Sequence, residues 1–435
     1  MDKKILSSCI FALLTGVTLS FTPNILATTT YIQSSVNSEM EEFSLLQEKL
    51  STSQHYFPEN FDTTNFLQDA SKAIQSAINQ CNDSGGGVVE LRKGIYNSGP
   101  LTLRSNVYLQ IDSGASLVAL PMNEYPQSTN PPNFIYALGV HNCGIIGGGV
   151  IDGSGAQWWQ AYLNTKNSPN PIPRPRLIYF DGCNNIVVSG IILKNSPSFH
   201  IVPRRSSDVL IQNITIETDV PSPNTDGIDP ATSTNVYINH CSISDGDDNI
   251  AIKAQDGPTS NVFITNCNFG LGHGLSIGAQ SNAGVSNIYC LNNTFDGTTT
   301  GIRIKNAFNT VGTVSNIYYL NSTMKNVGVP LEISAYYPES AIPAPFLSTH
   351  PSGDSLIADD ICVDSLVATG VTGNALLIVA APQNPFKDLA FSNVDIMSSS
   401  GAIVRNTTMT VHNVNIEANS GSEFIRQENA NIIQN

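Results

Sequence analysis

Residues 261–267 read Asn261-Val-Phe-Ile-Thr-Asn-Cys267, and variants of the first four letters return along the middle of the chain. The copies begin at residues 185, 208, 235, 261, 287 and 316 and read NIVV, DVLI, NVYI, NVFI, NIYC and NIYY. Weaker copies begin at residues 106, 360 and 388. Such a spacing, with β-branched residues and no helical period, predicts an all-β chain folded as a single-stranded parallel β-helix, a solenoid whose coils pair with their neighbours.

A second strand follows in each coil, with apolar residues at every other position. Because alternate strand residues point to opposite faces, one set is expected in the core and the other on the solvent face. The expected core set is Ile250, Ile252, Leu275, Ile277, Ile302, Ile304, Leu331 and Ile333. The expected solvent set is Ala251, Lys253, Ser276, Arg303, Lys305 and Glu332.

Alignment of these second strands predicts a functional site. Asp226, Asp248 and His273 each stand two residues before the first inward residue of their strand, so they form one column on three coils about 4.8 Å apart. Asp247 stands one residue earlier, and a pair of cations, Arg303 and Lys305, projects from the next coil. Carboxylates in one cleft can divide acid and base roles, and the cations can hold an anionic substrate.

The chain ends are expected to differ from the repeat. Residues 1–27 have a short positive start, an apolar run and a small residue at the end, which predicts a secretory signal peptide and an extracellular protein. Residues 28–56 are polar and expected to be loosely ordered, and 57–435 are expected to form the β-helical catalytic domain. Apolar spacing over 66–81 predicts a short N-terminal capping helix. The Pro-rich stretch 337–357 is expected to form a loop beside the cleft.

Asparagines recur five residues after many of the phrase starts. We expect them to point inward and to hydrogen-bond along the solenoid axis, which would make the glycosylation triplets at 213, 292 and 321 accidental. The asparagines are Asn213, Asn266, Asn292, Asn321 and Asn393. At the next position Cys241 and Cys267 are expected to stack as free thiols, while the pairing of the other mature cysteines stays open.

Composition and spacing exclude several partners. The net charge of −15 and the absence of any long basic run exclude nucleic acid. No C-x-x-C occurs, and the aspartates at 245, 247 and 248 lack the spacing of a calcium loop, so we expect no metal and no cofactor. After removal of the signal peptide we expect a monomer without a membrane contact.

The four site segments together resemble the polygalacturonase family of glycoside hydrolases (family 28), right-handed parallel β-helices that hydrolyse pectin. The segments are NTDG at 224–227, GDD at 246–248, GHG at 272–274 and RIK at 303–305. The likeness runs from about Asp62 to the mid-400s and includes GVIDGSG at 149–155, which leads to Trp158 and Trp159. Either tryptophan could stack on sugar or bury a cap. One departure is Ala279, where the family usually has serine.

The resemblance implies a role for each residue of the column. Asp247 would be the general acid, and Asp226 and Asp248 would deprotonate the attacking water with inversion at the anomeric carbon. His273 would orient the site or assist Asp247. Carboxylates packed so closely cannot all ionise easily, so the pKa of one of them should be raised.

The resemblance also implies which residues would bind the substrate. Arg303 and Lys305 would hold a galacturonate carboxylate. Asn224 and Tyr337 are placed with the substrate-binding residues, with Tyr336 as the alternative tyrosine. Lys253 is a further possible contact.

The resulting hypothesis is a secreted inverting hydrolase of the α-1,4 bonds of pectin and polygalacturonate. The alternatives are cleavage of rhamnogalacturonan or substituted galacturonan on the same scaffold, a calcium-dependent pectate lyase, and a non-enzymatic β-helical binding protein or adhesin. Endo and exo action are both compatible with the sequence.

Overall fold

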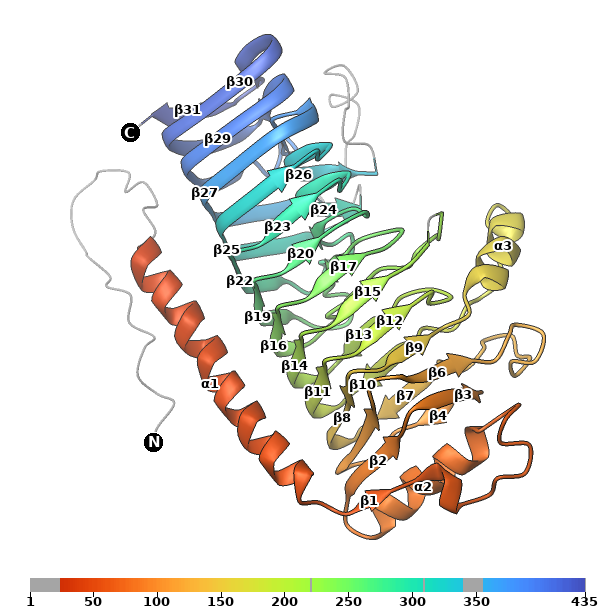
Figure 1. Cartoon of the computed structure of the whole chain (residues 1–435). Coiled ribbons are helices and arrows are strands. Elements are labelled where there is room, and N and C mark those ends of the chain that lie inside the picture. Colours follow the sequence, from red (N-terminus) through yellow and green to blue (C-terminus); the bar gives the residue numbers. More distant parts are fainter. Residues whose placement is uncertain (1–23, 220, 308–309, 339–354, 435) are drawn as a thin grey trace.

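The computed structural model describes residues 24–219, 221–307, 310–338 and 355–434. Within them the chain winds into coils whose strands pair in parallel with those of the next coil (Figure 1). Three lengthwise stacks of strands result, and helices lie at one end and on the outside. The parallel β-helix predicted from the repeat is therefore confirmed.

The first stack contains the recurring phrase. Its β-branched residues form columns in the interior, as in Ile211, Ile238 and Ile264, which are register partners on successive coils and are fully buried. The strands are β1 (His55–Tyr56), β2 (Gly87–Leu91), β5 (Val107–Ile111), β8 (His141–Gly147), β11 (Asn184–Ser189), β14 (Ser207–Gln212), β16 (Thr234–Asn239), β19 (Thr259–Thr265), β22 (Val285–Leu291), β25 (Gly312–Lys325), β27 (Leu356–Asn374), β29 (Phe386–Arg405), β30 (Thr407–Gln427) and β31 (Asn431–Gln434).

The second stack consists of short strands that continue each coil and merge with the long strand β25. They are β3 (Gly94–Ser98), β6 (Ala115–Ala119), β9 (Val150–Asp152), β12 (Ile192–Lys194), β15 (Thr215–Glu217), β17 (Ser242–Ser244), β20 (Asn268–Phe269) and β23 (Thr294–Asp296).

The third stack positions the site. Its two parts are joined by isolated bridges, two at each step. One set runs from Ile201 to Ile228 to Ile250, after which Leu275 and Ile302 continue the same register. This confirms the register inferred from the sequence. The strands are β4 (Leu101–Thr102), β7 (Ile135–Leu138), β10 (Ile178–Asp181), β13 (Ile201–Arg204), β18 (Ile250–Ile252), β21 (Leu275–Ile277), β24 (Thr300–Ala307), β26 (Val329–Tyr337) and β28 (Leu376–Val379).

The predicted capping helix is present as α2 (Ser71–Asp83), after a 3-10 turn η1 (Pro58–Asn60). It begins later than expected, and the Asp69 carboxylate accepts a hydrogen bond from the Ser71 amide at its start. Ala73, Ile74 and Ala77 are buried against the first coils. Helix α2 therefore covers the N-terminal end of the core.

A third helix, α3 (Ala156–Thr165), carries the two tryptophans and stands away from the coils (Figure 1). Trp158 is 3% exposed and packs edge-on against Tyr125. Trp159 is 7% exposed, and its Nε1 donates to the Ser196 carbonyl at 2.9 Å. Burial, one of the two interpretations left open by the sequence, is the observed one.

The expectation of loose order over residues 28–56 is wrong, because Ile25–Ser51 form one long helix, α1, that runs along the outside of the first stack (Figure 1). Ile32 and Val36 pack with Phe263 of β19, and Phe43 packs with Leu210 of β14. Few residues of the helix are apolar, but those few face an apolar stripe on the sheet. Packing against the sheet therefore stabilises a helix that its own sequence indicates only weakly. No described helix is long and apolar enough to cross a membrane.

The predicted signal peptide falls mostly on residues outside the described part, so it stays a prediction, as does the division of the chain at residues 27 and 56. Most of the Pro-rich stretch 337–357 also lies outside the described residues.

The asparagines that recur along the first stack hydrogen-bond from coil to coil, as expected, but they do not point inward. Asn292 donates to Asn266 at 3.2 Å and Asn321 to Asn292 at 2.7 Å, yet Asn292 and Asn321 are exposed. These positions have φ between 51° and 59°, a left-handed backbone that asparagine tolerates. Because the exposed Asn213 and its counterparts face out, the inward-pointing argument against the glycosylation triplets no longer holds.

The second-strand residues expected on the solvent face do point away from the core, but several are buried. Ser276 is fully buried, and Lys305 and Glu332 are 4% and 5% exposed. Ser276 and Lys305 both contact Asp248. Cys241 and Cys267 are buried free thiols, as expected, and the other described cysteines are also free.

Candidate active site

Asp248 is a buried carboxylate held by two cations. Its Oδ2 accepts a hydrogen bond from Lys305 Nζ at 2.8 Å, and its Oδ1 accepts from the Arg303 guanidinium and from Ser276 Oγ. Since β21 and β24 present Ser276, Arg303 and Lys305 on the outward face of the third stack, adjacent strands build this cluster. The two cations compensate the charge of a carboxylate that is only 3% exposed.

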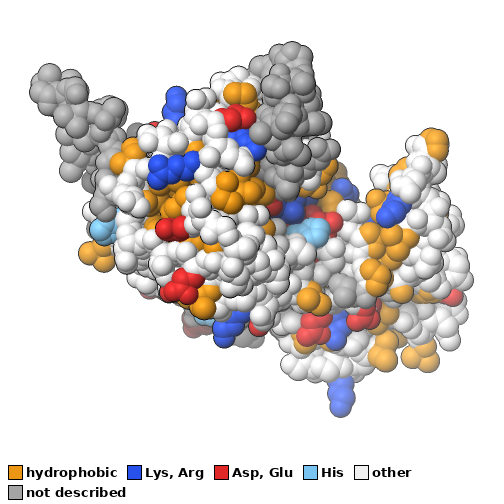
Figure 2. All heavy atoms as spheres, turned by 90° about the horizontal axis from the view of Figure 1, so that it is seen from above, with side chains coloured by type: hydrophobic (Ala, Val, Ile, Leu, Met, Phe, Trp, Pro, Cys, Tyr) orange, Lys and Arg blue, Asp and Glu red, His pale blue; other side chains and the backbone are white. Residues whose placement is uncertain are grey.

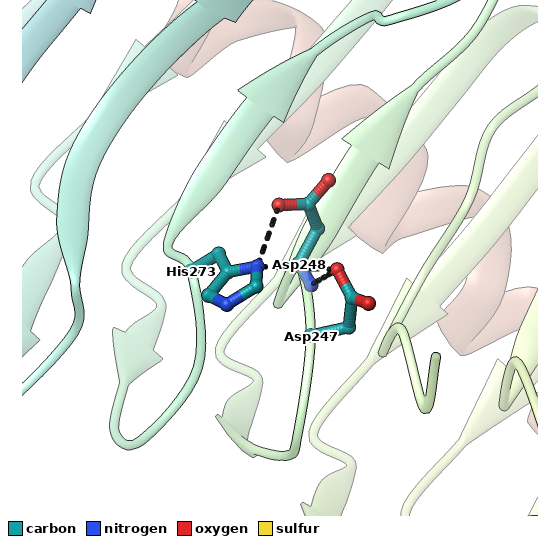
Figure 3. Close-up of side chains that lie close together, drawn as sticks. All are labelled: Asp247, Asp248 and His273. Carbon is teal, nitrogen blue, oxygen red and sulfur yellow. Dashed lines mark hydrogen bonds and ion pairs between the residues drawn. The ribbon is translucent and has the colours of Figure 1, made fainter. Parts of the chain in front are cut away.

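Asp247 lies beside it with its oxygens occupied by other partners (Figure 3). Its Oδ1 is 3.2 Å from His273 Nδ1 and accepts from the Asp248 amide, and its Oδ2 accepts from Asn224 Nδ2 at 3.2 Å. Burial acts to raise the pKa of Asp247, but the hydrogen bond and charge of His273, followed by the charge of Lys305, lower it below the usual value. Asp247 is therefore favoured as a carboxylate when His273 carries a proton.

Two glycines allow His273 to reach Asp247. Gly272 has φ +136°, and Gly274 has φ +77°, conformations that other residues rarely adopt. A Cβ on Gly274 would lie 2.0 Å from the Thr300 carbonyl oxygen, and one on Gly272 would lie 2.8 Å from the Asp247 carbonyl oxygen. The chain can pass this close to the neighbouring coils only without side chains.

Asp226 is in a different environment. It is 4% exposed, its Oδ2 is 3.2 Å from Lys253 Nζ, and its Oδ1 has no hydrogen-bond partner among the described residues. Lys253 Nζ is also 2.5 Å from Asp229 Oδ2, so one ammonium is shared by two buried carboxylates. Burial, and next the charge of Asp229, raise the pKa of Asp226, while Lys253 opposes the rise. Burial likewise raises the pKa of Asp229 to about 6.

The pKa of one carboxylate of the column, Asp226, is raised as expected, but burial is the larger cause and the charge of Asp229, outside the column, comes next. The pKa of Asp247, which the resemblance makes the general acid, is not raised.

Polar residues that sequence reasoning missed hold the loops of the site. Arg174 donates to Asn224 Oδ1 at 2.8 Å and to the Pro197 carbonyl at 2.9 Å, and its guanidinium stacks over Tyr162 of α3. His200 is fully buried, and burial lowers its pKa to about 4. Neutral His200 lies with Nδ1 3.2 Å from the Asp226 carbonyl oxygen and with Nε2 2.8 Å from Thr218 Oγ1.

Asp245 supports the loop that carries the two central carboxylates. It is fully buried, and its Oδ1 accepts a hydrogen bond from the Asp247 amide at 3.1 Å. Burial raises the pKa of Asp245. No local sequence pattern distinguishes Arg174 and His200, because their partners come from other coils, whereas the partner of Asp245 is two residues along the chain.

These side chains surround a cleft of about 530 Å³ on the outward face of the third stack. Figure 2 shows acidic, basic and histidine side chains gathered at a hollow on the face seen from above. Six of the predicted site residues line the cleft, and the other two, Arg303 and His273, contact Asp248. The six are Asn224, Asp226, Asp247, Asp248, Lys305 and Tyr337.

The structure separates the two candidate tyrosines. Tyr337 lies at the cleft with its ring centroid 4.8 Å from Lys305 Nζ, whereas Tyr336 is 3% exposed and packs in the core. Asn224 uses both ends of its amide within the protein, since it contacts Asp247 and Arg174.

Asp247, Asp248 and His273 also have the donor types that a metal ion binds, with ligand atoms within 4.8 Å of one another. However, Arg303 and Lys305 already compensate the charge of Asp248, so a metal ion would compete with two resident cations. The residues present fit an anionic ligand better than a metal ion.

Comparison with known proteins gives consistent similarities. The model of glycosyl hydrolases family 28 matches residues 81–422. An endo-polygalacturonase of Pectobacterium carotovorum subsp. carotovorum is 37% identical over 295 residues, which are 62% of this chain and 72% of the relative. An exopolygalacturonase of Zea mays is 31% identical over 79% of this chain and 82% of its own length.

A solved structure titled as the polygalacturonase from Erwinia carotovora ssp. carotovora superposes with a TM-score of 0.66 and 30% identity, covering 84% of this chain and 94% of its own. This likeness confirms the right-handed β-helix implied by the resemblance. The family is one of glycoside hydrolases, which sets aside the lyase and the non-enzymatic binding protein. Because the family model covers most of the chain, including every segment of the cleft described above, the chain belongs to glycosyl hydrolases family 28.

Proposed function

We propose that the protein is a secreted polygalacturonase that hydrolyses the α-1,4 bonds of polygalacturonate with inversion. The observation that carries the proposal is the convergence of Asp226, Asp247 and Asp248 on one cleft beside the buried Lys305. An ammonium next to a guanidinium suits the carboxylate of a uronic acid. The similarity to endo- and exo-polygalacturonases supports the same substrate class and leaves both modes of action within the proposal.

In this proposal a uronate carboxylate approaches Lys305 and Arg303 and competes with Asp248 for them. Because Lys305 and Arg303 then neutralise less of its negative charge, Asp248 becomes a stronger base toward a water molecule. Asp226 holds the same water through Oδ1, the oxygen without a partner in the described protein. Asp247, next to Asp248 in the same loop, protonates the leaving glycosidic oxygen.

The lowered pKa of Asp247 in the free protein is opposite to what a general acid requires. Bound substrate would correct it in two ways. A uronate beside Lys305 offsets part of the positive charge that lowers the pKa, and a sugar covering the carboxylate removes water from it. The assignment thus requires that Asp247 takes up its proton in the substrate complex.

The test uses purified protein and polygalacturonate. We expect release of reducing ends, a first product of inverted anomeric configuration by NMR, no unsaturated product, and no loss of activity with a chelator. Asp248→Asn should abolish the release and leave the circular dichroism unchanged. Full activity of Asp248→Asn would show that Asp248 is not the catalytic base.

A panel of pectin fractions separates the proposal from the alternative on the same scaffold. Faster cleavage of rhamnogalacturonan or substituted galacturonan than of plain polygalacturonate would favour that alternative. Lys305→Ala should raise KM for de-esterified substrate more than for methyl-esterified substrate, because only the former presents a carboxylate.

A further inference from the structure

A second hollow adjoins the active-site cleft on the side of the N-terminal coils. It has a volume of about 350 Å³, and Arg176 and Tyr179 line both it and the cleft. Tyr136 of β7 and Tyr179 of β10 are register partners on its floor, with ring centroids 5.9 Å apart and an angle of 23° between the rings. The cleft therefore continues into a groove with a stacked aromatic floor.

Arg176 stands where the two hollows meet. Its guanidinium carbon lies 4.9 Å from the ring centroid of Tyr179 and 5.5 Å from that of Phe199. No acidic side chain of the described residues forms an ion pair with it, and its buried Nε has no hydrogen-bond partner there. Stacking fixes the plane of the guanidinium without using its hydrogen-bond donors.

The other cations at the cleft are already committed within the described structure. Lys305 is paired with Asp248, Lys253 with Asp226 and Asp229, and Arg204 with Asp256. Arg174 donates to Asn224 and to two backbone carbonyls. Among the described residues, Arg176 is thus the cleft-lining cation whose guanidinium can bind an external anion without giving up an ion pair or a side-chain hydrogen bond.

We propose that Arg176, with the Tyr136 and Tyr179 rings, forms a second uronate-binding site in which the guanidinium pairs with a sugar carboxylate and the sugar ring packs on the tyrosines. The inference rests on the proposed function, since its ligand is another residue of the same polyuronate chain. Tyr179 pairs with Val202, whose neighbour Ile201 bridges to Ile228 beside Asp229. Tyr179 therefore lies two coils, about 10 Å along the axis, from the coil of Asp226, and three coils, about 14 Å, from the coil of Asp247 and Asp248, which is beyond a single sugar.

The experiment compares ligands that reach both sites with ligands that reach one. Binding of a galacturonate dimer and a galacturonate hexamer is measured by calorimetry in the Asp247→Asn background, with and without Arg176→Gln. We expect Arg176→Gln to weaken hexamer binding about 10-fold or more, to leave dimer binding within about 2-fold, and to leave binding of a fully methyl-esterified hexamer unchanged. Arg176→Lys should recover part of the lost affinity, and the exposed Arg104→Gln serves as the matched control.

Equal hexamer affinity with and without Arg176→Gln would overturn the inference. So would an equal loss for the dimer and the hexamer, or for the esterified hexamer, because either would mean that the substitution disturbs the catalytic cleft or the fold. If the wild-type chain does not cleave polygalacturonate but still binds the hexamer through Arg176, the proposed function fails and this site stands. If it neither cleaves nor binds, both fail.

Discussion

At the scale of single residues, Lys253 has an electrostatic role that the sequence did not reveal. It is shared by Asp226 and Asp229, which lie almost fully out of solvent. Arg174, Asp247, Asp248 and the neutral His200 also face this pair, so its charge depends on the whole cleft. The shared ammonium favours the ionised form of Asp226 against burial and against the charge of Asp229.

Two substitutions should therefore move the acidic limb of the pH–rate profile in opposite directions. Lys253→Met removes the charge that opposes the rise in the pKa of Asp226, so the limb should shift to higher pH. Asp229→Asn removes the largest like charge raising that pKa, so the limb should shift to lower pH. The measurement is kcat/KM for polygalacturonate against pH.

Lys194, which is partly exposed and pairs with Glu217 away from the cleft, provides the control Lys194→Met. Shifts of the same sign in the two cleft variants, or no shift in either, would contradict the proposed sharing of the ammonium.

Asp247 can be tested through the leaving group of the substrate. A general acid matters most when the leaving oxygen is a poor leaving group, so Asp247→Asn should lose about 10²–10⁴-fold in kcat on oligogalacturonate. On an aryl galacturonide with an acidic phenol the loss should be much smaller. Asp248→Asn should lose the same activity on both substrates. If the aryl galacturonide restored activity to Asp248→Asn and not to Asp247→Asn, Asp248 would be the acid and Asp247 the base.

At the scale of elements, the loop between β20 and β21 depends on close contact between coils. Gly274→Ala would place a Cβ against the Thr300 and Gly301 carbonyls and displace His273. We expect a large fall in kcat and a lower Tm. Gly284 has a similar left-handed φ of +97° but open space around it, so Gly284→Ala should cost only the backbone strain, about 1 kcal/mol, and leave kcat unchanged. Similar kcat values for both variants would show that contact at Gly274 is unimportant.

Helix α1 should contribute stability without contributing to the chemistry, because it lies on the first stack while the cleft lies on the third. Ile32 is fully buried against β19 and its neighbours, so Ile32→Ala should lower the free energy of unfolding by about 2–4 kcal/mol. Leu45 on the same helix is 67% exposed, and Leu45→Ala should change it by less than about 0.5 kcal/mol. Denaturant unfolding measures both. A reduced kcat for Ile32→Ala at low temperature would connect the helix to the site.

At the scale of the whole molecule, the repeat predicted the stacking because a period of one coil fixes which residues become neighbours. That is why Asp226, Asp248, His273 and Lys305 meet as expected. The direction of the asparagines was predicted wrongly, because their left-handed backbone reverses the alternation that holds inside a strand. Asp229 and His200 could not be identified, and Lys253 was predicted only as a possible substrate contact, because their environment is created by loops from several coils.

Helix α1 was missed for a related reason. Its buried positions, Ile32, Val36, Phe43 and Leu50, are separated by four and seven residues, a helical spacing that is present but thin within a polar segment. The helix has few apolar residues of its own and becomes recognisable only beside the apolar stripe that it covers.

A solenoid whose coils contact only adjacent coils unfolds like a row of weakly linked units, which can fray from either end. Helix α1 changes this connectivity, because its buried residues share one apolar cluster with Val88 near one end of the row and another with Cys362 many coils away. Coils that lie far apart in the row therefore unfold together in one cooperative transition. Without this brace the melting curve should broaden into partial steps, with the terminal coils opening before the centre.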